Sequence, residues 1–281
     1  MAFQLHVSGL NTLSKCGIQF ERRYLMGERI APGWAALVGT AVDRSVRKNL
    51  QSVIDTGEPI SDAEAMDVAR DTLVEEWEKG DGVFQPEEDE TRDAGIDAAV
   101  DLSSLHYREV APEIKPIRVA RTFVLDLQGF DMQLAGEIDI DEERRIRDTK
   151  TSKKSPSKDQ AHQSLQMTTY SLARLVLDGS LPEEVSLDYL VRLKTPKSLT
   201  VSATPEKEHF NELFARIEAA HVAMRKGAFI PAPLDAWWCS AKWCGFHSTC
   251  RYARKPMMVA AGATLESEIK NTLIQIQQKA G

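Results

Sequence analysis

Apolar residues in the first part of the chain recur every three or four positions, which is the spacing that buries one face of a helix. This spacing predicts helices at residues 9–25 and 38–54, and further helices at 61–79 and about 88–110. We expect the two later helices to form a helical insertion at about 55–112. The apolar stripe of residues 61–79 consists of Ala65, Val68, Ala69, Leu73 and Trp77.

In the middle of the chain the apolar spacing falls to two residues, which is typical of half-buried strands. In one such stretch, alternation places Leu134 and Ile138 on one face and Asp139 on the other. The order of elements indicates an α/β (α+β) protein with a mixed central sheet flanked by helices and a core at about 113–205. The expected elements are strands at about 117–126, 130–140 and 144–151, a helix at about 158–178, strands at 185–193 and 199–203, and a helix at 205–227.

Two neighbouring predicted strands carry the strongest catalytic signal. Asp139 ends a Gly-Glu-Ile-Asp run at 136–139, and Asp148 and Lys150 lie two apart on the next strand, where they share a face. Two carboxylates that face each other across a hairpin make a hard-oxygen site suited to Mg²⁺ or Mn²⁺, and a lysine beside them orients or activates a water. This is the minimum equipment for metal-assisted phosphodiester hydrolysis. The competing interpretation is a pair of solvated carboxylates at strand ends.

The four cysteines divide into Cys16 and a group of three, Cys239, Cys244 and Cys250. Four thiolates satisfy either a tetrahedral Zn²⁺ ion or a [4Fe–4S] cluster, so both metals stay open on this pattern. His247 lies within the group of three and could replace a cysteine in a zinc site. If Cys16 joins the other three, a metal ties both ends of the chain together, which predicts a clasp around a central domain.

Length and composition indicate the number of domains and the cellular compartment of the protein. The 281 residues suffice for one or two domains with a sizeable core. No apolar run reaches the roughly 18 residues of a membrane span, and the first residues lack the basic start and apolar stretch of a signal peptide. We therefore expect a cytoplasmic protein, in which reduced thiols bind metal and do not pair as disulfides.

The net charge of −7, from 35 lysines and arginines against 42 aspartates and glutamates, argues against a protein that coats nucleic acid without specificity. Residues 144–158 depart from this average, because they hold seven basic side chains and a single acid, Asp148. Such a basic strip could hold a phosphate backbone, with Lys153, Lys154 and Lys158 as the expected DNA contacts. A solvated loop is the ordinary alternative for a run of this kind.

Two further motifs accompany the hairpin and the cysteines: Gly-Thr-Ala-Val-Asp at 39–43 and Gln-x-x-x-Tyr at 166–170. Taken together, these motifs resemble the PD-(D/E)XK nuclease superfamily, and in particular its RecB-like, AddB-like branch with an iron–sulfur cluster. The resemblance extends from about residue 8 to residue 252. Phage exonucleases and the CRISPR-adaptation nuclease share this plan, and a free-standing chain of this length resembles them most. The motifs are Gly-Thr-Ala-Val-Asp at 39–43, Gly-Glu-Ile-Asp at 136–139, Asp-x-Lys at 148–150, Gln-x-x-x-Tyr at 166–170 and the one-plus-three cysteines.

The resemblance implies a metal-binding and a catalytic role for the residues of the hairpin. Asp139, Asp148 and the backbone carbonyl of Thr149 would hold one or two Mg²⁺ or Mn²⁺ ions. Asp43 would join them from the early helix, where the family has a histidine; aspartate is also a competent hard-oxygen ligand. Lys150 would position or deprotonate the attacking water and stabilise the pentacovalent phosphate.

The resemblance also implies roles outside the hairpin. Gln166 and Tyr170 would contact DNA or the catalytic lysine. Cys16, Cys239, Cys244 and Cys250 would hold a structural [4Fe–4S] cluster. The spacing of the last three cysteines, four and then five residues, differs from the family spacing of two and five, so zinc remains the alternative.

The implied domain plan is a single nuclease domain at 1–256, whose cluster-binding segment at about 228–256 includes Cys16 as its fourth ligand, and a C-terminal tail at 257–281, helical at 264–279. The implied activity is that of an exonuclease on DNA ends or single strands, in the recombination, repair or replication of a phage or mobile element. Two alternatives belong to other classes. One is a noncatalytic nucleic-acid-binding or assembly module, and the other is a CRISPR-adaptation-like endonuclease that works with partner proteins.

Overall fold

The computed structural model describes residues 2–79, 83–84, 87–253 and 269–270. The chain divides into two compact units, Met1–Leu234 and Asp235–Gly281. The first unit contains the sheet and the helices named below, and the second, described at 235–253, is built of turns. None of the helices in the described part of the chain has the length and apolar character needed to cross a membrane.

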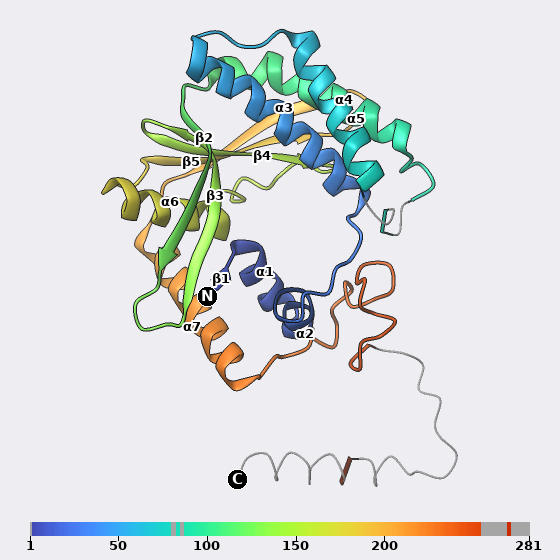
Figure 1. Cartoon of the computed structure of the whole chain (residues 1–281), viewed down its shortest axis with the longest axis vertical. Helices are drawn as coiled ribbons and strands as arrows, with labels where there is room; N and C mark the ends of the chain where they lie inside the picture. Colours follow the sequence, from blue (N-terminus) through green and yellow to red (C-terminus); the bar gives the residue numbers. More distant parts are fainter. Residues whose placement is uncertain (1, 80–82, 85–86, 254–268, 271–281) are drawn as a thin grey trace. The chain divides into compact units, whose positions relative to one another are not determined.

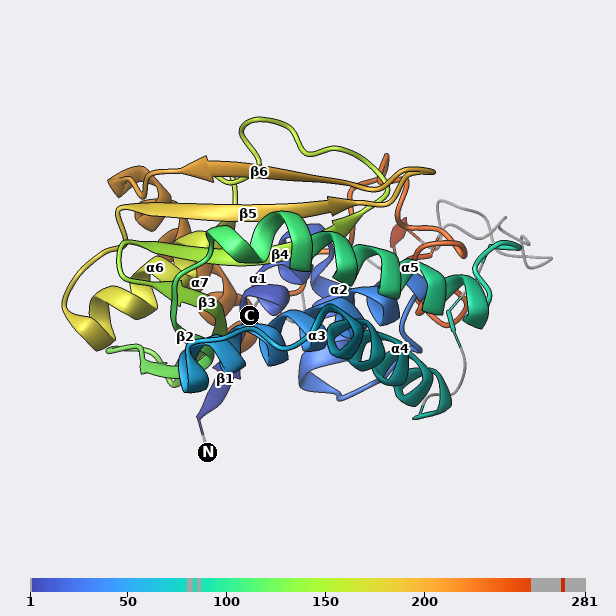
Figure 2. The same ribbon diagram turned by 90° about the horizontal axis from the view of Figure 1, so that it is seen from above.

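A mixed sheet of six strands forms the centre of the first unit (Figures 1 and 2). β3 lies between β2 on one edge and both β1 and β4 on the other, and the sheet continues through β5 to β6. β1 with β3 and β4 with β5 are parallel pairs, and the other pairs are antiparallel. The strands are β1 (Phe3–Leu5), β2 (Pro116–Asp126), β3 (Met132–Glu142), β4 (Arg145–Ser152), β5 (Glu184–Val191) and β6 (Lys197–Ala203).

Helices cover both faces of this sheet, and Figure 1 shows α3, α4 and α5 together on one side and α6 on the other. Two π-helical turns, Glu21–Leu25 and His106–Val110, and a 3₁₀ turn, Ala111–Glu113, complete the unit. The helices are α1 (Val7–Lys15), α2 (Gly17–Phe20), α3 (Trp34–Thr56), α4 (Asp62–Lys79), α5 (Arg92–Leu105), α6 (Leu165–Asp178) and α7 (Lys207–Lys226). The mixed sheet flanked by helices confirms the predicted fold class.

Two hydrophobic cores hold the helices to the sheet. One packs α1, α2, α6 and α7 against strand residues such as Leu134, Ile138 and Ile146. The other packs α3, α4 and α5 together, with Ile140 and Leu190 contributed by the sheet. Apolar burial of this extent on both faces fixes the strands that carry the predicted acids, so their side chains are presented from a rigid support.

The predicted helix at 9–25 is interrupted at Cys16, whose backbone is extended (φ −164°, ψ 108°) between α1 and α2. The N–H of Gly17 donates to the carbonyl of Ile230 at 2.6 Å, and a Cβ on Gly17 would come within 2.7 Å of the Ile230 nitrogen. Only glycine allows two backbones to approach so closely. The break at Cys16 therefore follows from a contact more than two hundred residues away.

The predicted helix at about 158–178 begins later, at Leu165. Ser164 caps it, because its hydroxyl accepts a hydrogen bond from the N–H of Met167 at 3.3 Å. Residues 153–164 are bends and turns, so the predicted DNA-binding lysines precede the helix. The predicted C-terminal helix at 264–279 falls outside the described residues, except for 269–270, which are helical.

Candidate active site

A gap in strand pairing along β3 creates the site. β2 pairs with β3 over most of its length. On the other edge of β3, β1 pairs at Met132–Leu134 and β4 pairs only at Ile140 and Asp141. Among the described strands, none therefore pairs with residues 135–139 on this edge, and β3 and β4 diverge there.

A cleft of about 610 Å³ lies at this gap. It is lined by residues of β3, β4, α1, α3 and α6. All five predicted catalytic residues line it, and so do Asp43 and Thr149, so the fold brings together positions from 43 to 170. The polar lining residues are His6, Ser8, Asn11, Thr40, Asp43, Arg47, Glu137, Asp139, Asp148, Thr149, Lys150, Thr151, Gln166 and Tyr170.

α3 turns one polar stripe toward the cleft while its apolar face packs on the sheet and on α4 and α5. Ala36, Gly39, Asp43 and Arg47 recur at intervals of three and four residues and all line the cleft. The helix lies close to β4 here, since a Cβ on Gly39 would stand 3.4 Å from the hydroxyl of Thr151. The sequence thereby places the Asp43 carboxylate within reach of the strand acids.

Four carboxylates face the cleft: Asp43 from α3, Glu137 and Asp139 from β3, and Asp148 from β4. Burial raises the pKa of Asp139 far above its ordinary value, and a hydrogen bond to Asp148 and the negative charges of Asp148 and Asp43 add to this effect. Burial also raises the pKa of Asp43, against the opposing effect of Arg47. A cation placed among these groups would relieve the repulsion.

Lys150, Gln166, Asp148 and Tyr170 form a hydrogen-bonded group. The Lys150 ammonium donates to Gln166 Oε1 at 2.9 Å and lies 2.7 Å from Asp148 Oδ2. Gln166 Nε2 donates to Asp148 Oδ1 at 2.9 Å and to the Tyr170 hydroxyl at 2.6 Å. Burial, followed by the charges of Asp139 and Asp148, raises the pKa of Tyr170, which keeps the phenol neutral. Gln166 thus holds the lysine and the acid in one fixed arrangement.

Arg47 and Glu137 belong to the site although no catalytic role was predicted for them. The Arg47 guanidinium lies 2.7 Å from Asp43 Oδ2 and 3.0 Å from Asp139 Oδ1, and it also pairs with Glu137. These contacts raise the pKa of Arg47, despite its partial burial. Two signals were present in the sequence: Arg47 lies four residues after Asp43 on a helix, and Glu137 shares a strand face with Asp139.

The donor set fits a divalent metal ion. Asp148 Oδ2 is buried with the Lys150 ammonium at 2.7 Å as its ion-pair partner, and Asp139 beside it is costly to ionise without a cation. Carboxylate oxygens are the ligands that Mg²⁺ and Mn²⁺ prefer. Thr149 also lines the cleft, between Asp148 and Lys150, so its carbonyl is the natural candidate for a further oxygen ligand.

The basic strip at 144–158 is less available than its sequence indicates. Arg147 is 2% exposed and pairs with Glu142 and Asp188, each at 2.9 Å. Lys153 is exposed but lies 3.1 Å from Glu90 and 3.4 Å from Glu87. None of Lys153, Lys154 and Lys158 lines the cleft. The contact of these three lysines with DNA therefore stays a prediction, and it would lie outside the cleft.

The predicted cluster ligands lie in both units. Cys16 belongs to the first unit, and Cys239, Cys244 and Cys250 belong to the turns of the second. All four are partly exposed. Over the residues with described positions, no three-ligand group with atoms within 4.8 Å of one another includes a cysteine. The [4Fe–4S] cluster and the clasp thus stay predictions.

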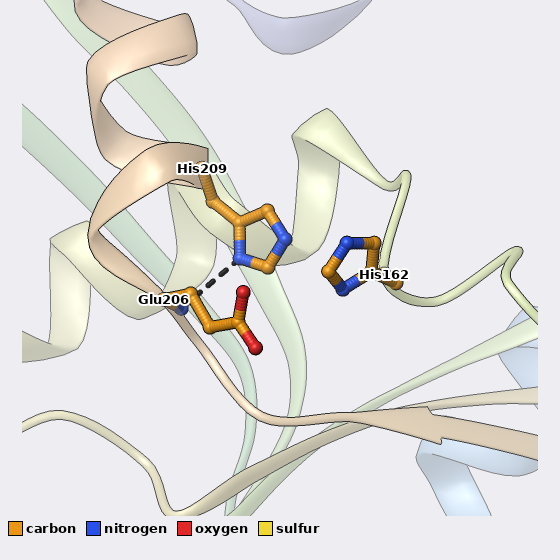
Figure 3. A group of neighbouring side chains, drawn as sticks. All are labelled: His162, Glu206 and His209. Atoms are coloured by element: carbon orange, nitrogen blue, oxygen red, sulfur yellow. Dashed lines mark hydrogen bonds between the residues drawn. The ribbon is translucent and has the colours of Figure 1, made fainter.

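A separate group, His162, Glu206 and His209, has one potential ligand atom from each residue within 4.8 Å of the others (Figure 3). His209 Nδ1 accepts a hydrogen bond from the Glu206 N–H at 3.0 Å, in the capping box of α7. A neutral imidazole that accepts at Nδ1 carries its proton on Nε2, the nitrogen facing His162 in Figure 3. A metal ion on Nδ1 would displace this hydrogen bond, and a metal ion on Nε2 would move the ring proton to Nδ1, which could then no longer accept it. We therefore interpret the group as the N-terminal cap of α7.

The cleft presents Asp139, Asp148 and Lys150 from two strands of a mixed sheet flanked by helices. This arrangement is typical of nucleases, a class of phosphodiester hydrolases. The chain belongs to the PD-(D/E)XK nuclease superfamily, because the model of that family matches residues 4–251. This match confirms the superfamily that the motifs indicated.

Among solved structures, a protein from Eubacterium rectale described as a putative exonuclease has a similar fold. The TM-score is 0.60 at 13% identity, over 92% of this chain and 94% of that one. The protein SSO0001 matches with a TM-score of 0.35 at 13% identity, over 78% of this chain and 96% of that one, which adds nothing to the argument. Comparison with curated proteins gave no match.

Proposed function

We propose that this protein is a Mg²⁺- or Mn²⁺-dependent deoxyribonuclease, and specifically an exonuclease that acts on DNA ends or single strands. The observation that carries the proposal is the hydrogen-bonded group of Asp148, Lys150 and Gln166 beside Asp139 in the cleft. Membership of the PD-(D/E)XK superfamily supports phosphodiester hydrolysis as the reaction. The recombination, repair or replication of a phage or mobile element is the setting we propose for this activity.

The residues of the hairpin would hold the metal. Asp139, Asp148 and the carbonyl of Thr149 are the proposed ligands, and Asp43 is the predicted ligand from α3. A bound Mg²⁺ or Mn²⁺ ion supplies positive charge for the phosphate and for the leaving oxygen. Without this ion, the acids would repel both one another and a DNA phosphate.

Lys150 would act on the water and the phosphate. Its ammonium is fixed by Gln166 and Asp148 and lines the cleft, so it can donate to an attacking water or to a phosphoryl oxygen in the transition state. Tyr170 stays neutral and supports Gln166, which keeps the lysine from turning away. The chain's own groups therefore provide orientation and charge stabilisation.

The size of the cleft supports strand ends or single strands as substrates. Its volume of about 610 Å³ lies within the range of roughly 300–1,000 Å³ typical of small-molecule sites. A space of this size holds a few nucleotides of a strand end or of a single strand. The basic side chains at 153–158 would guide the strand toward the cleft from outside.

Digestion of labelled DNA tests the proposal. The purified protein is incubated with linear single-stranded, linear double-stranded and circular single-stranded DNA, with Mn²⁺ or with EDTA. We expect Mn²⁺-dependent release of short products from linear substrates and none from circles. Cleavage of circles would replace the exonuclease assignment with an endonuclease such as the CRISPR-adaptation type.

Two substitutions identify the residues responsible. Asp148→Asn and Lys150→Ala should abolish digestion while circular dichroism shows a folded protein. Asp131→Asn and Lys226→Ala, which change exposed residues outside the cleft, serve as matched controls and should keep full activity. Digestion by both site variants at the control rate would refute the assignment. DNA binding without Mn²⁺-dependent cleavage in the unchanged protein would favour the noncatalytic module.

The four cysteines would hold a structural [4Fe–4S] cluster. Anaerobic purification followed by visible absorption and metal analysis tests this. A brown protein with about four irons per chain supports the cluster. A colourless protein with one zinc supports the alternative.

A further inference from the structure

Arg47 places a permanent positive charge among the acids of the cleft. It reaches them from α3, and its guanidinium pairs with Asp43 at 2.7 Å, with Asp139 at 3.0 Å and with Glu137. Its side chain is 29% exposed, so it is held largely inside the cleft. An arginine keeps its charge at any working pH and offers a planar set of donors to several carboxylates at once.

The charge balance of the cleft leaves room for one divalent ion. Asp43, Glu137, Asp139 and Asp148 carry four negative charges when all are ionised. Arg47 and Lys150 offset two of these, and one Mg²⁺ or Mn²⁺ ion would balance the other two. A second divalent ion would leave these side chains with a net positive charge and would compete with the guanidinium for the same carboxylates.

The contacts divide the acids into two groups. Arg47 contacts Asp43, Glu137 and Asp139, whereas Asp148 is paired with Lys150 at 2.7 Å. Asp139 and Asp148 also share a hydrogen bond. No three of these four carboxylates meet the 4.8 Å condition that the histidine group at α7 satisfies. Asp43 is therefore arranged as a partner of the guanidinium, and Asp139 and Asp148 are the two acids that contact each other directly on the hairpin.

We propose that Arg47 takes the place of a second metal ion, so that the site binds a single Mg²⁺ or Mn²⁺ ion at Asp139 and Asp148 and Asp43 serves Arg47. This inference rests on the proposed function and determines its metal stoichiometry. Arg47 is thus a positioning residue for the acids. The sequence predicted Asp43 as a direct metal ligand. The proposal removes Asp43 from that ligand set.

Manganese binding to the full chain without DNA tests this inference. Isothermal titration calorimetry gives the number of Mn²⁺ ions per chain, and electron paramagnetic resonance detects the coupling between two adjacent Mn²⁺ ions. The unchanged protein should bind one ion without coupling. Arg47→Met, which keeps the length of the side chain and removes its charge, should bind a second ion and show the coupled signal.

Three further variants complete the design. Arg47→Lys restores a positive charge and should return the stoichiometry to one. Asp43→Asn should keep one ion with nearly unchanged affinity, whereas Asp139→Asn should lose it. Arg44→Met is the matched control, because Arg44 lies on the same helix and pairs with Glu75 outside the cleft. It should bind Mn²⁺ like the unchanged protein.

Two outcomes overturn the inference: two ions bound by the unchanged protein, or a single ion bound by a folded Arg47→Met variant. The first needs no Arg47 variant, so the test stands even if that variant fails to fold. The digestion assay keeps the two proposals apart. A protein that cuts DNA with two ions refutes only the role of Arg47, and a protein that binds one ion and cuts nothing refutes only the nuclease.

Discussion

Replacing Gln166 by alanine removes the side chain that joins Lys150 to Asp148. The substitution deletes an acceptor for the ammonium at 2.9 Å and a donor to the carboxylate at 2.9 Å, together with the donor to Tyr170 at 2.6 Å. Lys150 would keep its contact with Asp148 but lose the amide that fixes its direction. The chemical groups of the reaction stay in place, so the variant tests orientation alone.

The expected loss follows from these contacts. A hydrogen bond to a charged group contributes about 1.5–3 kcal/mol. If one such contribution is lost from the transition state, the rate falls by about 10- to 150-fold. Gln166→Glu keeps the acceptor for Lys150 but replaces the amide donor with a second negative charge beside Asp148, so its loss should be larger.

Steady-state digestion of a single-stranded oligonucleotide at saturating Mn²⁺ measures this effect, with urea unfolding as a check on stability. The fall should be in kcat, because Gln166 acts on the position of Lys150. Gln163→Ala, an exposed glutamine in the turn before α6, is the control. A kcat for Gln166→Ala equal to that of the control would show that the hydrogen-bonded group does not orient the lysine.

Three further predictions concern stability and are measured by urea unfolding. Asp141→Asn should cost about 3–5 kcal/mol, because the fully buried carboxylate pairs with three arginines, including the buried Arg174; a loss below about 1 kcal/mol would contradict this. Gly136→Ala should cost about 1–3 kcal/mol, because its Cβ would stand 2.6 Å from the Phe123 ring; unchanged stability would show that the ring can move. Burial lowers the pKa of His106 to about 4, so the unfolded chain binds the proton more tightly. The free energy of unfolding should therefore fall by up to about 3 kcal/mol as the pH falls from 6.5 to 4. A His106→Leu variant whose free energy of unfolding changes with pH by the same amount would show that His106 is not the cause.

The acids and the lysine of the hairpin could be predicted because strand alternation is a local property. Asp148 and Lys150 share a face in any strand that contains them. Arg47 could not be assigned in this way. Its contacts with Glu137 and Asp139 join residues 90 and 92 positions apart, and they depend on how α3 crosses the sheet. The local signal at Arg47, its position four residues after Asp43, does not contain that information.

The basic strip at 144–158 is a case in which local sequence predicted more than the structure provides. Arg147 was counted among the cations available to DNA. In the structure its side chain is buried and donates to Asp188, 41 residues away. Whether a cation is already paired depends on neighbours that come from other strands. A count of charges in a segment therefore gives only an upper limit to the charge that a ligand can meet.

Strands carry most of the acids of the cleft, and helices carry the groups that hold them. Asp139 on β3 is held by Arg47 of α3, and Asp148 on β4 is held by Gln166 of α6. Burying a carboxylate without such a partner is costly, so each contact that arranges the site also attaches a helix to the sheet. The two helices approach from opposite faces, and the gap between β3 and β4 is the place where both can reach the acids. The position of the cleft is therefore a consequence of the incomplete strand pairing, because a continuous β3–β4 ladder would close the space in which these side chains meet.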